Sequence, residues 1–200
     1  MRPAVLLLAH GSPDVRHTKT IAAITTAVGR AIDVPVAHAF LEHHAPDASA
    51  AIRGLVARGG TALVTVPLLL SAAYHRESDV PHAVAEGTAA FPGLRTVIAD
   101  VLAPDPRLAR ALQRRLVEAS AAPDACVVLA TAGARGEVAS AQTAEVAASL
   151  ARVRRAEVHA AAPSNVTQVL AAIGRPAAVV PYLLAPGVIC DRIRDAARSG

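Results

Sequence analysis

The chain has very few aromatic residues and very few cysteines. Phe, Trp and Tyr make up 2% of its 200 residues, whereas 53% of the residues are hydrophobic. The core must therefore be built mainly from Ala, Val, Leu and Ile, which pack through close contacts between helices and sheets. The two cysteines, Cys126 and Cys190, are too few and too far apart for a disulfide framework or a zinc cluster, and we interpret both as core residues.

Long apolar runs are also missing. One of the longest, at 62–70, falls well short of the ~18 residues that a membrane-spanning helix needs. The first residues lack the cationic stretch, apolar run and small-residue cleavage site of a signal peptide. We therefore expect a soluble, cytoplasmic protein with no membrane partner.

Lysine is nearly absent, and the positive charge is spread out. The net charge of +4 comes almost wholly from arginines distributed along the chain, because Lys19 is the only lysine. No basic stripe interleaved with aromatic residues is present, which argues against a nucleic-acid partner and suits an acidic small ligand better. The nucleotide-binding patterns G-x-x-x-x-G-K-[ST] and G-x-G-x-x-G are missing, and Ser12 lacks the G-x-S-x-G elbow of a serine hydrolase.

What the sequence does contain is a regular alternation of apolar strands and amphipathic helices. A buried strand is predicted at 5–9 and ends at His10-Gly11-Ser12. A helix is predicted to begin with Asp47 or Ser49 as its N-cap and to end at Gly59-Gly60. Further strands are predicted at 34–41, 62–70 and 94–102, and further helices at 18–31, 79–90 and 106–119. This order predicts an α/β protein with a doubly wound parallel sheet of strand order 2-1-3-4. Pro67 should loosen strand pairing near the end of the third strand.

The second half repeats the first. Strands at 126–134, 157–164 and 179–187 match the first three, and a helix at 191–198 follows. Gly133 corresponds to Gly11, so we predict two lobes, residues 1–121 and 122–200. The polar groups at the strand ends occur in one copy only, because Ala132, Ser164 and Ile189 stand where the first copy has His10, Glu42 and His75.

His10, Glu42 and His75 each follow a predicted strand of the first lobe. The carboxyl ends of parallel strands share one edge of the sheet, where ligands bind. Two imidazoles and a carboxylate there could hold a divalent first-row metal transiently, or take up protons near neutral pH. Each residue alone has a structural alternative: a strand cap for His10, a solvated loop for Glu42 and a helix start for His75. Their loss from the second copy favours the functional interpretation.

Three ordered motifs carry a family resemblance. The segments 7–12 (LLAHGS), 40–42 (FLE) and 66–75 (VPLLLSAAYH), the last followed by Asp79-Val80-Pro81, resemble the sirohydrochlorin chelatase family of the CbiX and SirB type. The resemblance implies a class II chelatase fold of two flavodoxin-like lobes with an active cleft between them. It also implies insertion of Fe2+ or Co2+ into sirohydrochlorin, for siroheme or cobalamin biosynthesis, without nucleotide hydrolysis.

The resemblance also implies roles for particular residues. His10 and His75 match the catalytic and metal-handling histidines, and Glu42 matches the active-site carboxylate. The metal is then a substrate, and no resident cofactor is expected. Because sirohydrochlorin is a polycarboxylic acid, arginines near the site are candidate partners for it. The candidate substrate-binding residues are Ser12, Ser71, Ala72, Ala73, Tyr74, Arg76 and Arg135.

Three alternatives stay open. A phosphohistidine phosphatase also ends a strand in His-Gly, but it places an arginine before the histidine where this chain has Ala9. A non-catalytic metal- or tetrapyrrole-carrying protein would use the same residues, and sequence does not separate it from an enzyme. His43, His44 and His82 do not have the spacing of a closed metal site, and we interpret them as surface residues, of which His43 or His44 could assist metal entry.

The expected oligomeric state is a monomer or a homodimer.

Overall fold

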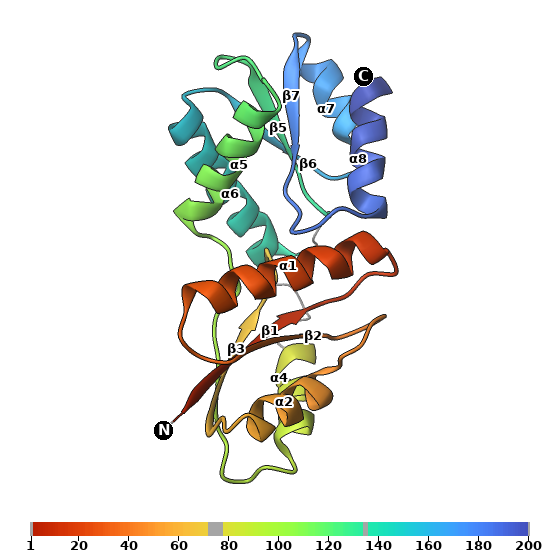
Figure 1. Cartoon of the computed structure of the whole chain (residues 1–200). Helices are drawn as coiled ribbons and strands as arrows, with labels where there is room; N and C mark the ends of the chain where they lie inside the picture. Colours follow the sequence, from red (N-terminus) through yellow and green to blue (C-terminus); the bar gives the residue numbers. More distant parts are fainter. Residues whose placement is uncertain (1, 72–77, 134–135, 200) are drawn as a thin grey trace. The chain divides into compact units, whose positions relative to one another are not determined.

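The computed structural model describes residues 2–71, 78–133 and 136–199. The chain forms two compact units, Met1–Leu102 and Ala103–Gly200, and each is built around its own parallel sheet (Figure 1). Within the described residues, no helix is both long and apolar enough to cross a membrane.

The sheet of the first unit has the predicted strand order. Its strands are β1 (Pro3–Ala9), β2 (Val36–Phe40), β3 (Ala62–Pro67) and β4 (Arg95–Ile98), arranged β2-β1-β3-β4 with every neighbouring pair parallel. The third strand ends at Pro67, three residues earlier than predicted. Proline has no N–H to donate to a neighbouring strand. One further hydrogen bond between the two segments follows it, in which the Leu68 N–H donates to the Leu8 carbonyl (2.8 Å).

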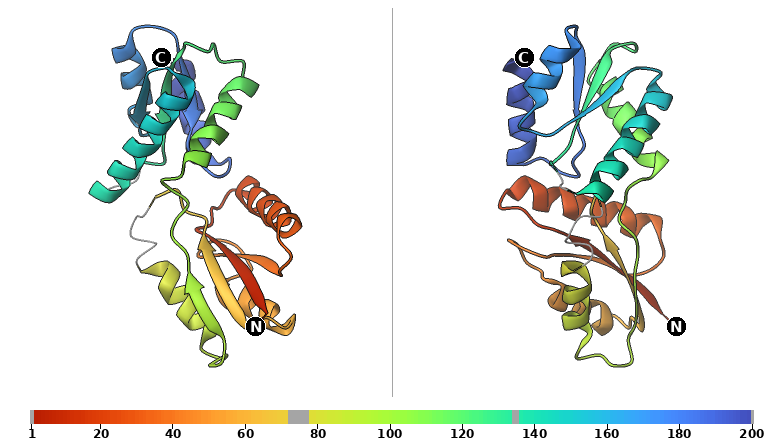
Figure 2. Two further views of the ribbon diagram at one scale, coloured as in Figure 1. Left: turned by 90° about the vertical axis from the view of Figure 1, so that its left-hand side faces the viewer. Right: turned by 180° about the vertical axis from the view of Figure 1, so that it is seen from behind.

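Helices cover both faces of this sheet (Figures 1 and 2). Helix α1 (Val15–Ala31) lies on one face, and α2 (Ala48–Ala57) and α4 (Asp79–Thr88) lie on the other. Alternation along β1 sends Leu6 and Leu8 into the core beneath α2 and α4. The N-cap of α2 is Asp47, whose carboxylate accepts from the Ala50 N–H (2.7 Å), as the sequence allowed.

The second unit repeats this layering on three strands. Strands β5 (Cys126–Ala130), β6 (Val158–Ala161) and β7 (Ala177–Pro181) are parallel in the order β6-β5-β7. Helices α5 (Pro106–Glu118) and α6 (Glu137–Arg154) lie on one face of the sheet, and α7 (Val166–Ile173) and α8 (Val188–Ser199) on the other (Figure 2). The sequence repeat predicted the three strands of this unit but no bounds for α6 and α7.

Strand register confirms the internal repeat residue by residue. Leu8 pairs with Ala39 on one side and Pro67 on the other, while Ala130 pairs with Ala161 and Pro181. Counting from these positions makes Ala132 the counterpart of His10 and Ser164 the counterpart of Glu42. The matching glycines, Gly11 and Gly133, both have positive φ, 103° and 83°.

The division between the units differs from the predicted lobe boundary after residue 121. It lies between Leu102 and Ala103, so α5 belongs to the second unit. The physical reason is that α5 packs on α6, where the buried Arg154 side chain donates to the Gln113 amide oxygen (3.2 Å) and to the Ala121 and Ala122 carbonyls after α5.

Candidate functional site

His10 and Glu42 lie on adjacent backbones at the carboxyl edge of the first sheet. Beyond the ends of β1 and β2, the Leu41 N–H donates to the Ala9 carbonyl and the Glu42 N–H donates to the His10 carbonyl, both at 2.9 Å. A Cβ at Gly11 would overlap the Glu42 carbonyl oxygen, and φ there is +103°. Only glycine therefore allows the two segments to approach this closely.

The chain turns sharply after Glu42. The His44 N–H donates to the Glu42 carbonyl (2.9 Å), and the intervening His43 has φ of 71°, a combination typical of a γ-turn. Residues with a Cβ rarely adopt this conformation, and such strain is concentrated at functional sites. The exposed His43 ring lies with Nε2 3.5 Å from Glu42 Oε2.

His44 is held against the loop that follows His10. Its Nε2 lies 2.6 Å from the Ser12 carbonyl oxygen, and its ring meets the edge of Phe40 with centroids 5.7 Å apart. A carbonyl only accepts, so Nε2 carries the proton and donates, and Nδ1 of the neutral ring is unprotonated. The interpretation of His44 as a surface residue is wrong, because the residue is half-buried and hydrogen-bonded; His43 and His82 are exposed, as expected.

His17, in the first turn of α1, is a further imidazole at this edge. It packs near Phe40 (ring centroids 6.1 Å), and no hydrogen-bond partner reaches its buried Nδ1 within the described residues. Burial lowers the pKa of His17 below its usual 6.5, and the nearby His44 and His10 rings lower it further, against a smaller opposite effect of Asp14. A neutral His17 is therefore favoured close to His10.

Sequence reasoning missed His17, although the histidine lies soon after the His10-Gly11-Ser12 motif, in the helix that follows the loop. Of the other predicted residues, Ser12 lies at the edge, since its carbonyl accepts from His44. Ser71 follows β3, which pairs with β1. The remaining predicted residues lie outside those the structure describes: Ala72, Ala73, Tyr74, His75, Arg76 and Arg135. The pairing of His10 with His75 thus stays a prediction.

The fold and this edge together define a class of protein. It is a duplicated parallel α/β protein in which several imidazoles and the Glu42 carboxylate belong to residues at the carboxyl edge of one sheet. The family comparison agrees. The family model CbiX matches residues 4–119, more than half of the chain, and the chain therefore belongs to the CbiX family.

Solved structures extend the likeness to the whole chain. The sirohydrochlorin chelatase SirB from Bacillus subtilis subspecies spizizenii, in complex with cobalt, is 24% identical and superposes with a TM-score of 0.88, covering 100% of this chain and 82% of its own. SirB from Bacillus subtilis with Fe3+ is also 24% identical and superposes with a TM-score of 0.89, covering 100% of this chain and 83% of its own.

A putative cobalamin biosynthesis CbiX protein from Marinobacter aquaeolei VT8 is 26% identical, with a TM-score of 0.52, over 59% of this chain and 97% of its own. Comparison with curated proteins gives no significant match. The SirB likeness confirms the predicted fold class of two parallel-sheet α/β lobes.

Proposed function

We propose that this protein inserts a divalent metal ion, Fe2+ or Co2+, into sirohydrochlorin without nucleotide hydrolysis. The observation that carries the proposal is the edge formed by His10, Glu42, His17 and His44 in a chain of the CbiX family. Two SirB structures of the same fold, one in complex with cobalt and one with Fe3+, support a first-row metal as the ion handled there.

The chemistry of the reaction explains this donor set. Placing a divalent ion in a tetrapyrrole removes two pyrrole N–H protons, so the enzyme needs proton acceptors and ligands that release the ion. Neutral imidazoles meet both needs, whereas thiolates would hold the metal too firmly. In this account the metal is a substrate that passes through the site.

Each described residue then has a role. His10 binds the ion transiently and accepts a pyrrole proton, with His75 as its proposed partner from the sequence resemblance. Glu42 orients an imidazole or relays the proton. The lowered pKa of His17 keeps that ring neutral, so it adds no positive charge beside His10 to repel the dication. His44 connects the turn after β2 to the loop after β1, because its ring donates a hydrogen bond to the Ser12 carbonyl.

We also propose that arginines bind the carboxylates of the tetrapyrrole. Arg76 and Arg135 are the candidates by position, Ser12, Ser71, Ala72 and Ala73 would permit close approach of the ring, and Tyr74 would stack on it. Neutralising Arg76 and Arg135 together should raise KM for the tetrapyrrole and leave KM for the metal unchanged. A double variant with an unchanged tetrapyrrole KM would remove both residues from the substrate site.

The test of the activity is a time course of sirohydrochlorin absorbance with metal and tetrapyrrole in large excess over protein, under anaerobic conditions. An enzyme converts many equivalents, and ATP has no effect on its rate. A protein that stops after one equivalent is a carrier, and the proposed activity is then wrong.

We further propose that the protein works in the cytoplasm as a monomer or homodimer, without membrane or nucleic-acid partners. Support comes from the spread of its arginines and from the polycarboxylate nature of the proposed substrate.

A further inference from the structure

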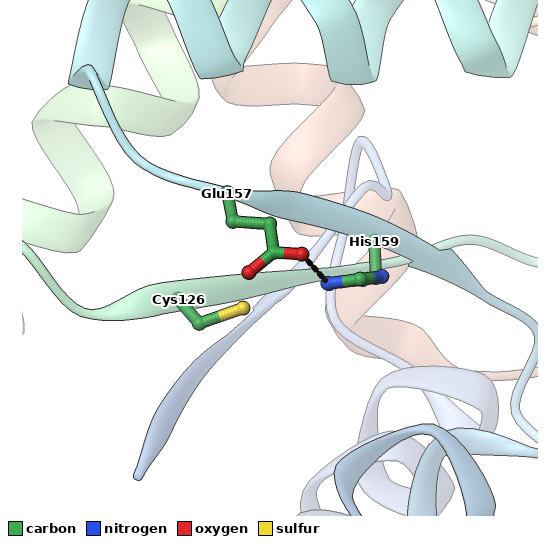
Figure 3. A group of neighbouring side chains, drawn as sticks. All are labelled: Cys126, Glu157 and His159. Atoms are coloured by element: carbon green, nitrogen blue, oxygen red, sulfur yellow. Dashed lines mark ion pairs between the residues drawn. The ribbon is translucent and has the colours of Figure 1, made fainter. Parts of the chain in front are cut away.

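Three side chains of metal-ligand type meet at the amino end of the second unit's sheet (Figure 3). Cys126 opens β5, Glu157 directly precedes β6, and His159 lies on β6. One ligand atom from each, Sγ, a carboxylate oxygen and a ring nitrogen, lies within 4.8 Å of the other two.

Strand register explains why they converge. Val127 pairs with Val158 and Val128 with His159, which sets Cys126 beside Glu157. Residues two apart on a strand share a face, so Cys126, Glu157 and His159 all lie on one side of the sheet. Because β6 is an edge strand, this side stays open to solvent at Glu157 and His159, whereas Cys126 is fully buried.

The duplicated fold does not require these residues. By the same register, the counterparts in the first unit are Ala4, Pro35 and Ala37, which carry no ligand atoms. The Val5 N–H donates to the Pro35 carbonyl just as the Val127 N–H donates to the Glu157 carbonyl, each at 2.9 Å. The ligand set is therefore a property of the second copy alone, at the end of its sheet opposite to Ala132 and Ser164.

The carboxylate is held in place from two sides. Glu157 Oε1 lies 3.1 Å from His159 Nε2, and Glu157 Oε2 accepts from Arg175 Nη2 at 2.6 Å. Arg175 thus occupies one oxygen and leaves the other directed toward the imidazole. Burial, and next the Glu157 charge, raise the pKa of the Cys126 thiol in the metal-free chain, and a bound cation reverses this preference.

We propose that Cys126, Glu157 and His159 form a three-ligand site for Zn2+. Thiolate, imidazole and carboxylate are the ligands that zinc takes, and three of them leave a fourth tetrahedral position for water. In a tetrahedral zinc site the ligand atoms lie roughly 3.5 Å apart, so small side-chain rotations from the present arrangement suffice. A thiolate holds the ion firmly, so this metal stays bound, unlike one that passes through the first unit.

Co2+ added without any tetrapyrrole tests the site, because a cobalt–thiolate bond gives a charge-transfer band in the near ultraviolet that imidazole and carboxylate ligands do not. The chain has two cysteines. We expect the absorbance of this band to saturate at one equivalent of Co2+ per chain. The band should be lost in Cys126→Ser and persist in the matched control Cys190→Ser. Adding Zn2+ should displace Co2+ and abolish the band. No band, or a band that depends on Cys190, would overturn the proposal.

Two variants guard against a folding defect of the buried Cys126→Ser. His159→Ala and Glu157→Gln change partly exposed side chains, and each should weaken Co2+ binding in this band about tenfold or more, since even outer partners of ligands matter that much. His82→Ala should leave the titration unchanged. Unaltered binding in both His159→Ala and Glu157→Gln would show that the site is wrong. None of these outcomes depends on metal insertion into sirohydrochlorin.

Discussion

Single residues decide how the candidate edge of the first unit is built. Gly11 lets the loop after β1 approach the backbone of Glu42, and His43 turns the chain so that His44 reaches the Ser12 carbonyl. The motif His10-Gly11-Ser12 was sufficient to predict where the first strand ends, directly before His10. His44 was interpreted as a surface residue and His17 was missed, because their placement depends on a tight turn and on packing against Phe40, which sequence spacing does not encode.

Substitution of Gly11 should therefore harm both stability and activity. Gly11→Ala imposes positive φ on alanine and a clash with the Glu42 carbonyl, while the repeat counterpart Gly133→Ala meets only ordinary contacts at 3.6 Å or more. We expect Gly133→Ala to cost about 1–2 kcal/mol, and Gly11→Ala to cost more and to slow metal insertion. Urea unfolding and initial rates measure both effects. Equal stability losses in the two variants would show that the close approach to Glu42 is unimportant.

The half-buried His38 should make stability fall in mild acid. Burial lowers its pKa below 6.5, so below that pH the unfolded chain binds a proton that the folded chain resists. The contribution of His38 to the free energy of unfolding is thus greatest above pH 6.5 and declines as the pH falls from there toward the lowered pKa.

His38→Asn should weaken this pH dependence. Thr25 Oγ1 donates to the Ile21 carbonyl (2.8 Å) and so accepts from His38 Nδ1 (3.0 Å), a bond that the asparagine amide preserves without titrating. Urea midpoints at about pH 7.5 and about pH 5.5 should differ less in His38→Asn than in wild type. The exposed His82→Asn is the control and should keep the wild-type difference. If His38→Asn also kept the wild-type difference between the two urea midpoints, burial of His38 would not explain the pH dependence of stability.

At the scale of helices and strands, periodicity and caps predicted most of the first unit. The strand order β2-β1-β3-β4 and the Asp47 cap agree with the prediction, whereas β3 ends at Pro67, three residues before the predicted end. The strand predicted at 94–102 is shorter in the structure, where β4 spans Arg95–Ile98. The compact units divide between Leu102 and Ala103, whereas the sequence repeat predicted a lobe boundary after residue 121.

Arg154 connects these two helices, and its loss should destabilise the second unit selectively. Arg154→Met removes donors to Gln113, Ala121 and Ala122 in a buried setting. We expect a cost of about 2–3 kcal/mol, seen as faster hydrogen exchange in β5 but not in β1. The exposed Arg152→Met on the same helix should change little. Faster exchange of β1 in Arg154→Met would contradict a stabilising role confined to the second unit.

For the whole molecule, one duplicated framework carries different side chains at different ends. The first copy places His10 and Glu42 at the carboxyl edge, where the second has Ala132 and Ser164. The second copy instead places Cys126, Glu157 and His159 at the amino edge. Comparing the repeats predicted the first set from sequence. The second set needed the strand register, which places Cys126 of β5 beside the β6 segment that carries Glu157 and His159, and Cys126 by itself resembles a core residue.

Initial rates of metal insertion into sirohydrochlorin test the central claim most directly. His10→Ala should slow the reaction by about 100-fold or more, because it removes both a proton acceptor and a metal ligand. The exposed His82→Ala should retain the wild-type rate. A folded His10→Ala variant that inserts metal at the wild-type rate would contradict the assignment of the reaction to this edge.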